Sequence, residues 1–240
     1  MPIKINKLES ARFGIVVANV VDNNAEFTTI DECAREHNVN LLTQRIDVGN
    51  LTRLHSLEEA GCRLMDTLVY YEKKLNKLEV TTLPIDGVKY RFAKPYDALA
   101  VGNLAQKAFQ GYFGHYHADV RLDNSLADAA YVEWAETSTT SVSSTAPVLL
   151  AEAGEQIVGF LTSKHQISQK TEILLNAVHP NFQGRRLYKA MVSATVEHAH
   201  SIGNKAIFVS TQINNYAVQK AWAQLGFEHV SSLYTLHKWY

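Results

Sequence analysis

A basic glycine turn near the end of the sequence carries the residues best suited to chemistry. Gln183-Gly184-Arg185-Arg186 lies between a stretch with strand character, Thr171–Val178, and a stretch with helical spacing that starts at Arg185. The first turn of a helix leaves backbone N–H groups unpaired and carries a partial positive charge. The turn therefore predicts a phosphate-binding site, with a basic helix start on a solvated surface as the alternative.

A second polar group follows the next expected strand. Ser210 and Thr211 end the stretch that starts at Ala206, and Asn215 opens a helix that carries Trp222. Ligands of open sheets bind beyond the carboxyl ends of the strands. The hydroxyl groups indicate a polar substrate pocket, although Ser and Thr also form turns at strand ends.

The segment Gly111–Trp134 gathers aromatic rings beside histidines and an acidic side chain. Rings next to hydrogen-bonding groups suit a sugar or nucleotide ring. Imidazole titrates near neutral pH, so His115 or His117 could take a proton from an ammonium group, and Asp119 adds a polar contact. The alternative is a segment that covers a sheet, with its histidines as caps. We expect most rings to be structural and one or two polar groups to contact a substrate.

The elements that must position these residues indicate two domains. The sequence predicts an N-terminal α/β domain over residues 1–80 and a second domain over residues 88–240, with turn-forming residues between them. Strands are expected at residues 13–21, 40–46, 63–71, 90–93, 147–152, 157–164, 171–178, 206–210 and after Gly226. Helices are expected at residues 28–37, 51–60, 97–109, 185–203 and from 215, with a polar loop at 138–145. This mixture predicts an α/β (α+β) fold with a mixed sheet.

Two corners of the sequence are similar to each other. Leu57–Tyr70 and Ala221–Tyr234 both read as the end of a helix, a glycine and a strand. Either such corners are common, or the first eighty residues are a shortened relative of the second domain.

The composition excludes several classes of protein. Hydrophobic residues make up 46% and charged residues 20%, and the formal charge is −1. Without clustered Lys and Arg we expect no nucleic-acid partner. No apolar run approaches the length of a membrane span and the N-terminus lacks a signal-peptide core, so we expect no membrane partner and a cytoplasmic protein. Two cysteines indicate no disulfide framework, and the ten histidines show no metal-ligand spacing, so no metal is expected.

The order of these elements resembles the acetyl-CoA half of the GNAT N-acetyltransferases. The two-domain plan is similar to the dTDP-fucosamine acetyltransferases, which act on nucleotide sugars. Glu9–Gly14 resembles their aromatic-Phe-Gly sequence, with Arg12 in place of an aromatic residue, and Leu57–Leu64 resembles their L-x-x-L-G-F-x-L. The resemblance implies a GNAT fold with a smaller, truncated N-terminal relative, acetyl-CoA as donor, and a small-molecule amine as acceptor. A nucleotide-linked amino sugar is the best acceptor hypothesis, and a homodimer is left open.

The resemblance also implies roles for residues. The strand before the turn splays from the following strand in this family, and backbone N–H groups at Ala177-Val178 would stabilise the thioester oxygen. Cofactor contacts are expected from Ala177, Val178, Gln183, Gly184, Arg185, Arg186, Leu187, Tyr188, Asn215 and Trp222. The family has small residues where Arg186 and Tyr188 stand.

The general acid is the least certain assignment. The family has a tyrosine acid where Trp222 stands, and an indole N–H is too weak an acid for that role. Either the thiolate leaves without a dedicated acid, or another hydroxyl such as Tyr234 or Tyr188 serves, with packing roles for Trp222 and Tyr234 as the alternative. The expected catalytic residues are Tyr234 and His117, and the expected substrate contacts are His115, Asp119, Ser210 and Thr211.

Two other functions fit the same residues. The acceptor could be an amino acid, a polyamine or another small amine. Alternatively, Arg186 and Trp222 mark a lost site in a CoA-binding module that performs no catalysis.

Overall fold

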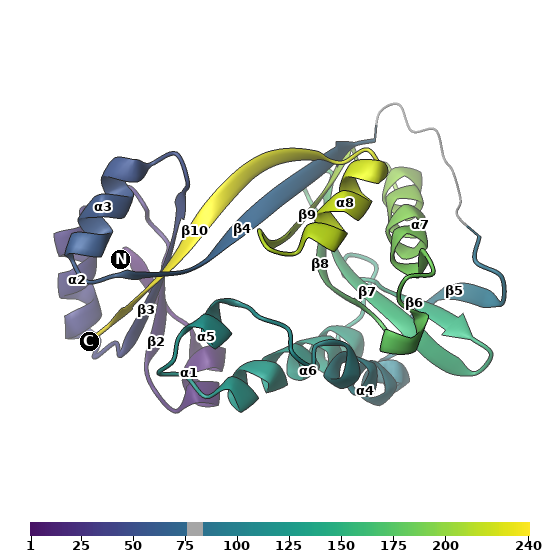
Figure 1. The fold of residues 1–240 in the computed structure, drawn as a ribbon, viewed down its shortest axis with the longest axis horizontal. Helices are drawn as coiled ribbons and strands as arrows, with labels where there is room; N and C mark the ends of the chain where they lie inside the picture. The colour runs from purple at the N-terminus through teal and green to yellow at the C-terminus, as the bar shows by residue number, and fades with distance from the viewer. Residues whose placement is uncertain (76–83) are drawn as a thin grey trace. The chain divides into compact units, whose positions relative to one another are not determined.

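The computed structural model describes residues 1–75 and 84–240 (Figure 1). The chain forms two compact units, of which the first comprises Met1–Val69, Phe113–Ala127 and Ser231–Tyr240 and the second comprises Tyr70–Tyr112 and Asp128–Val230. This division differs from the expected one at residues 80–88, because 113–127 and 231–240 join the first unit. The turn expected near residues 79–87 lies partly outside the described residues.

The first unit is built on a mixed sheet. Strands β1 (Ile3–Ile5) and β2 (Val17–Val20) are antiparallel, β2 and β3 (Leu41–Asp47) are parallel, and β3 is antiparallel to the end of β10 (Glu228–Trp239). Leu233 lies opposite Asp47 and Trp239 opposite Leu41. The unit also contains α1 (Lys7–Phe13), α2 (Phe27–Glu36), α3 (Leu51–Glu59), α5 (His115–Ala118), and the starts of β4 (Arg63–Lys74) and α6 (Asn124–Thr140).

Side chains alternate between the two faces of this sheet. Leu42 and Ile46 of β3 and Leu236 of β10 pack toward α2 and α3, in clusters with Ile30 and Leu54. Leu41 and Trp239 lie on the opposite face, where they pack with Phe13, Tyr116 and Leu122. The segment 113–127 therefore belongs to the face that carries Thr43, Arg45, Thr235 and His237.

The second unit is built on a sheet in the order β9-β8-β7-β6-β5, with residues of β4 beside β9. Its strands are β5 (Val88–Phe92), β6 (Val148–Ala153), β7 (Gln156–Gln166), β8 (Lys170–Val178) and β9 (Ala206–Gln212). β5 to β8 are antiparallel neighbours, whereas β8 and β9 are parallel. Parallel and antiparallel pairs in both units confirm the expected mixed class.

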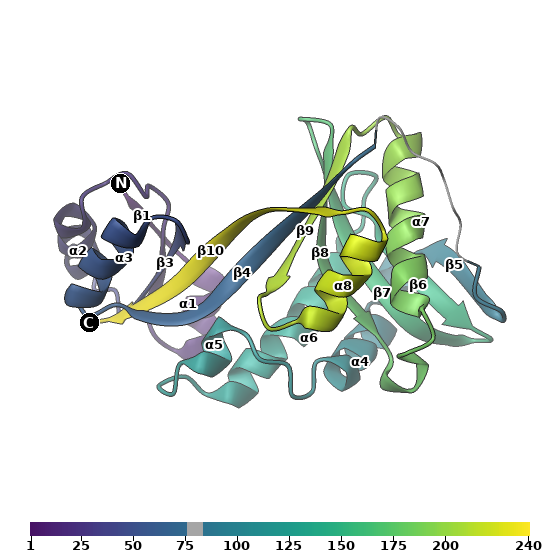
Figure 2. The same cartoon turned by 45° about the horizontal axis from the view of Figure 1, so that its top comes forward.

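Helices cover both faces of the second sheet (Figure 2). Helices α7 (Leu187–Ser201) and α8 (Tyr216–Gln224) bury Leu187, Met191 and Trp222 against one face. Helix α4 (Ala98–Ala108), which follows the 3₁₀ turn Pro95–Asp97, and α6 bury Val101, Leu104 and Ala135 against the other. A second 3₁₀ turn, Pro180–Phe182, connects β8 to the basic turn.

Two expected elements had the wrong bounds. A strand was expected at residues 13–21, but residues 7–13 form α1 and the strand begins at Val17. Asn6 caps α1 by accepting a hydrogen bond from the Glu9 N–H at 3.2 Å, and Gly14 ends it in the left-handed conformation. A loop was expected at residues 138–145, but α6 continues to Thr140. Within it the hydroxyls of Thr139 and Thr140 donate to carbonyl groups four residues earlier.

Candidate functional site

The carboxyl ends of β8 and β9 part in the second unit. The strands pair in parallel from Lys170–Ala206 to Ile173–Val209, and within the described part of the chain the pairing goes no further. β8 nevertheless continues to Val178 and β9 to Gln212. Near the ends of both strands, the backbone N–H and C=O groups on the facing edges therefore no longer pair with the other strand.

A bulge in β8 lies at the point of parting. Leu161 of β7 pairs with Asn176, whereas Ser163 pairs with Ile173, so β8 contains one extra residue. The Leu175 N–H donates to the Thr162 hydroxyl at 2.8 Å. Because of the extra residue, Ile173 packs against the α7 face while Leu175, two residues later, packs against the α4 face. A bulge bends and twists its strand, which directs β8 away from β9.

The hydrogen bonds of β8 identify which amides face that side. The His179 N–H donates to the Val158 carbonyl at 2.8 Å, and Phe160 pairs with Ala177. Hydrogen-bonded and non-hydrogen-bonded pairs alternate in an antiparallel ladder, so the Ala177 N–H faces β7 and the Val178 N–H faces away from it. Of the two amides predicted to donate to the oxyanion, Ala177 and Val178, only the Val178 N–H faces away from β7. The Asn176 N–H is the next amide on that side.

The basic turn leads directly into an uncapped helix. Helix α7 begins at Leu187, two residues later than expected, and no side chain caps it. Residues 183–186 are exposed, whereas Leu187 is buried in the core. The Gln183 side chain donates to the Val178 carbonyl at 3.4 Å, which connects the turn to the end of β8. The first N–H groups of α7 are thus available for an anion.

The two arginines of the turn differ in conformation and contact. Arg186 is the N-cap and has φ 64 and ψ 4, in the left-handed region that favours glycine, and Gly184 also has a positive φ of 74. The Arg185 guanidinium lies over the Phe182 ring, 5.2 Å from its centroid. Arg186 is exposed and belongs to no ion pair in the described ranges 1–75 and 84–240.

Trp222 is a core side chain that contacts a tyrosine in the first turn of α7. It is 1% exposed, lies 5.4 Å from the Tyr71 ring, and donates its indole N–H to the Tyr188 hydroxyl at 2.8 Å. Burial raises the pKa of Tyr188, against a smaller lowering effect of the Trp222 hydrogen bond, so this hydroxyl keeps its proton. The expected cofactor contact of Trp222 stays a prediction.

The hydroxyl groups at the end of β9 lie with Asn215. The Asn215 side-chain amide donates to the Thr211 hydroxyl at 3.0 Å, and Thr211 is buried whereas Ser210 is half-buried. The Tyr112 hydroxyl, from the aromatic segment, donates to the Gln212 side chain. Thr211 and Asn215 are therefore brought together in the second unit, whereas Ser210, the preceding strand residue, faces the other side of the sheet. The substrate contacts expected of Ser210 and Thr211 stay predictions.

The segment that contains His115 and His117 belongs to the first unit. It packs around His237, a strand residue that was not among the expected site residues. His237 of β10 is 1% exposed, and its Nδ1 lies 2.8 Å from the Asp119 carboxylate. Its Nε2 lies 2.9 Å from Nδ1 of His115. The Trp239 indole also donates to Asp119, at 2.8 Å. The spacing of Thr235, His237 and Trp239, which places all three on one face of β10, is the pattern in the sequence that could have indicated His237.

Electrostatics separate the members of this group. Burial acts to raise the pKa of Asp119, but hydrogen bonds from His237 and Trp239 outweigh it and lower the pKa to about 2. Burial, followed by the nearby charges of His237 and Arg45, lowers the pKa of His115 well below its usual range. At neutral pH Asp119 is therefore ionised and His115 is neutral.

His117 and Tyr234, the two expected catalytic residues, have structural contacts in the first unit. The Gly114 N–H donates to Nδ1 of His117 at 3.2 Å, which caps α5. Tyr234 lies opposite Ile46 in β10 and packs on the α2 and α3 face, away from the face of His237. Their catalytic roles stay predictions.

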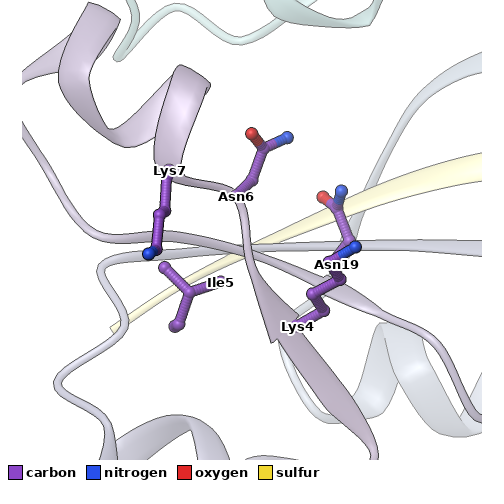
Figure 3. Close-up of a pocket in the computed structure, with 5 residues that line it drawn as sticks. All are labelled: Lys4, Ile5, Asn6, Lys7 and Asn19. Atoms are coloured by element: carbon purple, nitrogen blue, oxygen red, sulfur yellow. The ribbon is translucent and has the colours of Figure 1, made fainter.

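A hollow of about 400 Å³ lies elsewhere in the first unit, lined by Lys4, Ile5, Asn6, Lys7 and Asn19 (Figure 3). None of the expected site residues lines it. Among residues 1–75 and 84–240, no group of three His, Cys, Asp or Glu side chains is arranged to hold a metal ion. No helix in those ranges is long and apolar enough to cross a membrane.

Comparisons with known proteins match just over half of the sequence to a family and the whole fold to solved structures. The signature of the acetyltransferase (GNAT) family covers residues 100–227. The spore coat polysaccharide biosynthesis protein SpsD of Bacillus subtilis (strain 168) is 24% identical over 148 residues, which cover 61% of this chain and 49% of that protein. The chain thus spans about half the length of this curated relative.

Solved structures share the fold at low sequence identity. A GCN5-related N-acetyltransferase from Sphaerobacter thermophilus has a TM-score of 0.68 at 12% identity, over 99% of this chain and 76% of that chain. A tandem GNAT protein from the clavulanic acid biosynthesis pathway has a TM-score of 0.64 at 15% identity, over 93% of this chain and 75% of that chain.

Proposed function

We propose, from the premise that the chain belongs to the acetyltransferase (GNAT) family, that it transfers an acetyl group from acetyl-CoA to the primary amine of a small molecule. One observation carries this proposal. An uncapped helix start with a basic glycine turn follows β8, the bulged strand that parts from β9, after one 3₁₀ turn. A thioester cofactor with a diphosphate needs both an anion-binding backbone and main-chain donors for its acyl arm.

The turn and the strand would divide the binding of acetyl-CoA between them. The N–H groups at the start of α7 bind the diphosphate, helped by the exposed charge of Arg186, which has the freedom to reach a phosphate. Gln183 holds the turn against the Val178 carbonyl. Asn215, whose amide is oriented by Thr211, offers its side-chain oxygen to the pantetheine arm.

The reaction is a direct attack of the neutral amine on the thioester carbonyl. A C–N bond forms and the carbonyl oxygen takes up negative charge. The C–S bond then breaks to release the thiolate, and the nitrogen loses one proton to solvent, which balances the proton that the thiolate takes up. The Val178 N–H is the donor that stabilises the oxyanion, because it faces the side where β8 and β9 part. Holding both substrates together supplies much of the remaining rate by proximity.

Tyr188 is the proposed proton donor to the departing thiolate. Its hydroxyl is protonated at neutral pH, and the Trp222 indole N–H, 2.8 Å away, stabilises the phenolate that remains after proton transfer. Tyr188 belongs to the same unit as the turn. Tyr234 stays a second hypothesis for this role.

An amino sugar linked to a nucleotide is the proposed acceptor. The similarity to a spore coat polysaccharide biosynthesis protein supports a sugar. The Thr211 hydroxyl at the end of β9 supplies a polar contact of the kind that a sugar ring needs, and the Ser210 hydroxyl offers another from the opposite face of the strand. An amino acid or polyamine acceptor keeps the same chemistry and remains the alternative.

The test combines binding and turnover. Calorimetry with acetyl-CoA measures cofactor binding, and release of free thiol with a panel of amino sugars, amino acids and polyamines measures transfer. Turnover that is fastest on nucleotide-linked amino sugars supports the proposal. Binding without turnover on any amine indicates a non-catalytic module, and the absence of acetyl-CoA binding refutes the cofactor assignment.

A tyrosine pair tests the proton donor. Tyr188→Phe should lower kcat by about 10- to 100-fold while acetyl-CoA still binds, because only the departing thiolate needs the proton. Tyr216→Phe, on the exposed side of α8, is the matched control and should leave kcat unchanged. Equal kcat values for the two variants would remove Tyr188 from the mechanism.

A further inference from the structure

The end of β9 carries two polar side chains on the sheet face that α4 and α6 cover. Ile207 and Val209 of β9 belong to the core cluster on the α7 face. Because side chains alternate along a strand, Ser210 and Gln212 lie on the opposite face, and both are half-buried. Two hydrogen-bonding side chains are therefore placed on the α4 side of the second unit, at the end of the strand that parts from β8.

Tyr112, in the same unit, holds the Gln212 side chain in place. Its hydroxyl donates to the side-chain oxygen of Gln212. The Tyr112 ring packs against the α4-face cluster, which contains Ala177 of β8. It also lies steeply inclined to the rings of Phe109 and Tyr131, with centroids 5.4 Å and 5.1 Å away. Tyr112 therefore connects the cluster at the end of β8 to the end of β9.

The hydrogen bond from Tyr112 determines what Gln212 can offer a ligand. Because the phenol donates to the side-chain oxygen, both N–H groups on Nε2 remain. Neither of them has a hydrogen-bond partner within residues 1–75 or 84–240, and the same holds for the Ser210 hydroxyl. Half-buried polar groups of this kind suit a ligand that accepts hydrogen bonds. Gln212 and Ser210 are uncharged, so they suit a neutral oxygen rather than an ammonium group or a carboxylate.

The acceptor amine must approach from this face if acetyl-CoA binds as proposed above. The start of α7 and the Asn215–Thr211 pair hold the cofactor from the α7 face. The amine attacks the thioester carbonyl at the Val178 N–H, so it comes from the face that the cofactor leaves open. Neighbouring strands lie about 4.8 Å apart while they are paired, and the parted ends lie further apart. A molecule the size of one sugar ring therefore reaches from the thioester to Gln212.

We propose that Gln212 selects amine acceptors that carry a hydroxyl group close to the reacting nitrogen, by donating from Nε2 to the hydroxyl oxygen. This selection rests on the acetyl transfer proposed above and names a substrate class for it, the amino alcohols, to which amino sugars belong. A linear polyamine has no such oxygen and would instead need carboxylate partners. Gln212 is the specificity-determining residue, and Tyr112 is a positioning residue that acts through it.

The test compares two amines that differ by a single hydroxyl group. The smallest pair is trans-2-aminocyclohexanol and cyclohexylamine. Where turnover requires a nucleotide-linked sugar, the pair is a nucleotide-linked amino sugar and its analogue without the hydroxyl beside the amine. The kcat/KM values of both amines are measured from thiol release at saturating acetyl-CoA. Their ratio is then compared between variants, which cancels the difference in basicity between the two amines.

Removing the donor should remove the preference. Gln212→Leu should lower the ratio of amino alcohol to plain amine by about tenfold, the size of effect expected from one neutral hydrogen bond. The loss should fall on the amino alcohol alone, with the rate on the plain amine within about twofold of the wild type. That second rate also shows that the variant is folded. Gln212→Met, which is closer in shape, should give the same result if Gln212→Leu does not fold.

The role of Tyr112 is tested by removing its hydroxyl only. Tyr112→Phe keeps the packed ring but frees the carboxamide to rotate, so the ratio should fall by about threefold while acetyl-CoA affinity stays unchanged. Tyr96→Phe and Gln156→Leu, at exposed positions of the same unit, are the matched controls and should keep the wild-type ratio. A purely structural role of Tyr112 would slow both amines equally and leave the ratio unchanged.

The outcomes separate this selection from the acetyl transfer itself. If amines are acetylated but Gln212→Leu and Gln212→Met keep the wild-type ratio, the selection by Gln212 is refuted and the transfer stands. Faster turnover of spermidine than of the amino alcohol would refute it as well. If the wild type acetylates no amine of the panel described above, the proposed function fails and the selection fails with it.

Discussion

Replacing Arg186 with glycine should stabilise the folded chain, although it removes an entire charged side chain. Arg186 holds a left-handed backbone with φ 64, which costs an L-residue about 1–2 kcal/mol. Glycine adopts this conformation without the penalty but adds about 0.4–1 kcal/mol of unfolded-state entropy. The side chain is exposed and has no ion pair in the described residues, so its removal costs little. The net gain is about 0.5–1 kcal/mol, or about 2 °C in Tm for a chain of this size.

The matched variant is Arg185→Gly, one residue earlier in the same turn. Arg185 is not among the residues with positive φ, and its guanidinium lies over the Phe182 ring. Glycine there relieves no strain, adds the same entropy cost and removes a contact, so Tm should fall. Differential scanning calorimetry of both variants provides the comparison. A Tm for Arg186→Gly equal to or below that of Arg185→Gly would refute the reasoning from backbone strain.

The same position tests the phosphate contact separately. Arg186→Ala keeps the strained backbone but removes the charge, so it should weaken acetyl-CoA binding by about fivefold at low salt, and less at high salt. Binding measured by calorimetry at two salt concentrations checks this effect. Unchanged affinity at low salt would mean that the helix amides alone hold the diphosphate.

Three further changes have defined outcomes. Trp222→Phe should lower the free energy of unfolding by about 1–3 kcal/mol in urea titrations, because it removes the donor to Tyr188 and leaves a void. Thr162→Val leaves the Leu175 N–H without its acceptor at the bulge and should cost about 1–3 kcal/mol by the same assay. The pKa of Asp119 is depressed from 3.8 to about 2. The ionised carboxylate therefore contributes about 2 kcal/mol to the free energy of unfolding above pH 4, and this contribution is lost as pH falls through 2. Asp119→Asn should abolish this decline, which pH-dependent unfolding measures; a persistent decline would assign it to other carboxylates.

Local patterns in the sequence were sufficient for the order of elements in the second unit. The strands β6, β7 and β8 and helix α8 begin within two residues of their expected positions, because glycine turns and alternating apolar residues specify them. The start of α7 was misplaced by two residues, since a basic residue gives no sign that its backbone is left-handed. The turn expected at residues 183–186 is present in the structure.

Long-range pairing could not be predicted in the same way. The bulge that parts β8 from β9 depends on the hydroxyl of Thr162 in a neighbouring strand, and no local feature of β8 indicates it. The group around His237 depends on a segment 118 residues earlier in the chain, which supplies Asp119. Residue types in Gly111–Trp134 suggested proton chemistry, but only the fold identifies His115 and its partners.

The way in which β4 and β10 are shared determines how the chain can be divided and synthesised. Residues 70–74 belong to the second unit, whereas residues 231–240 pair with β3 in the first. A fragment that begins at residue 88 would contain residues 231–240 without their partner β3, and it would lack residues 70–74 of β4. Both changes expose sheet edges, which promotes aggregation. During translation the first unit must wait for its final strand until the whole second unit has been made, so folding from the N-terminus cannot be completed stepwise.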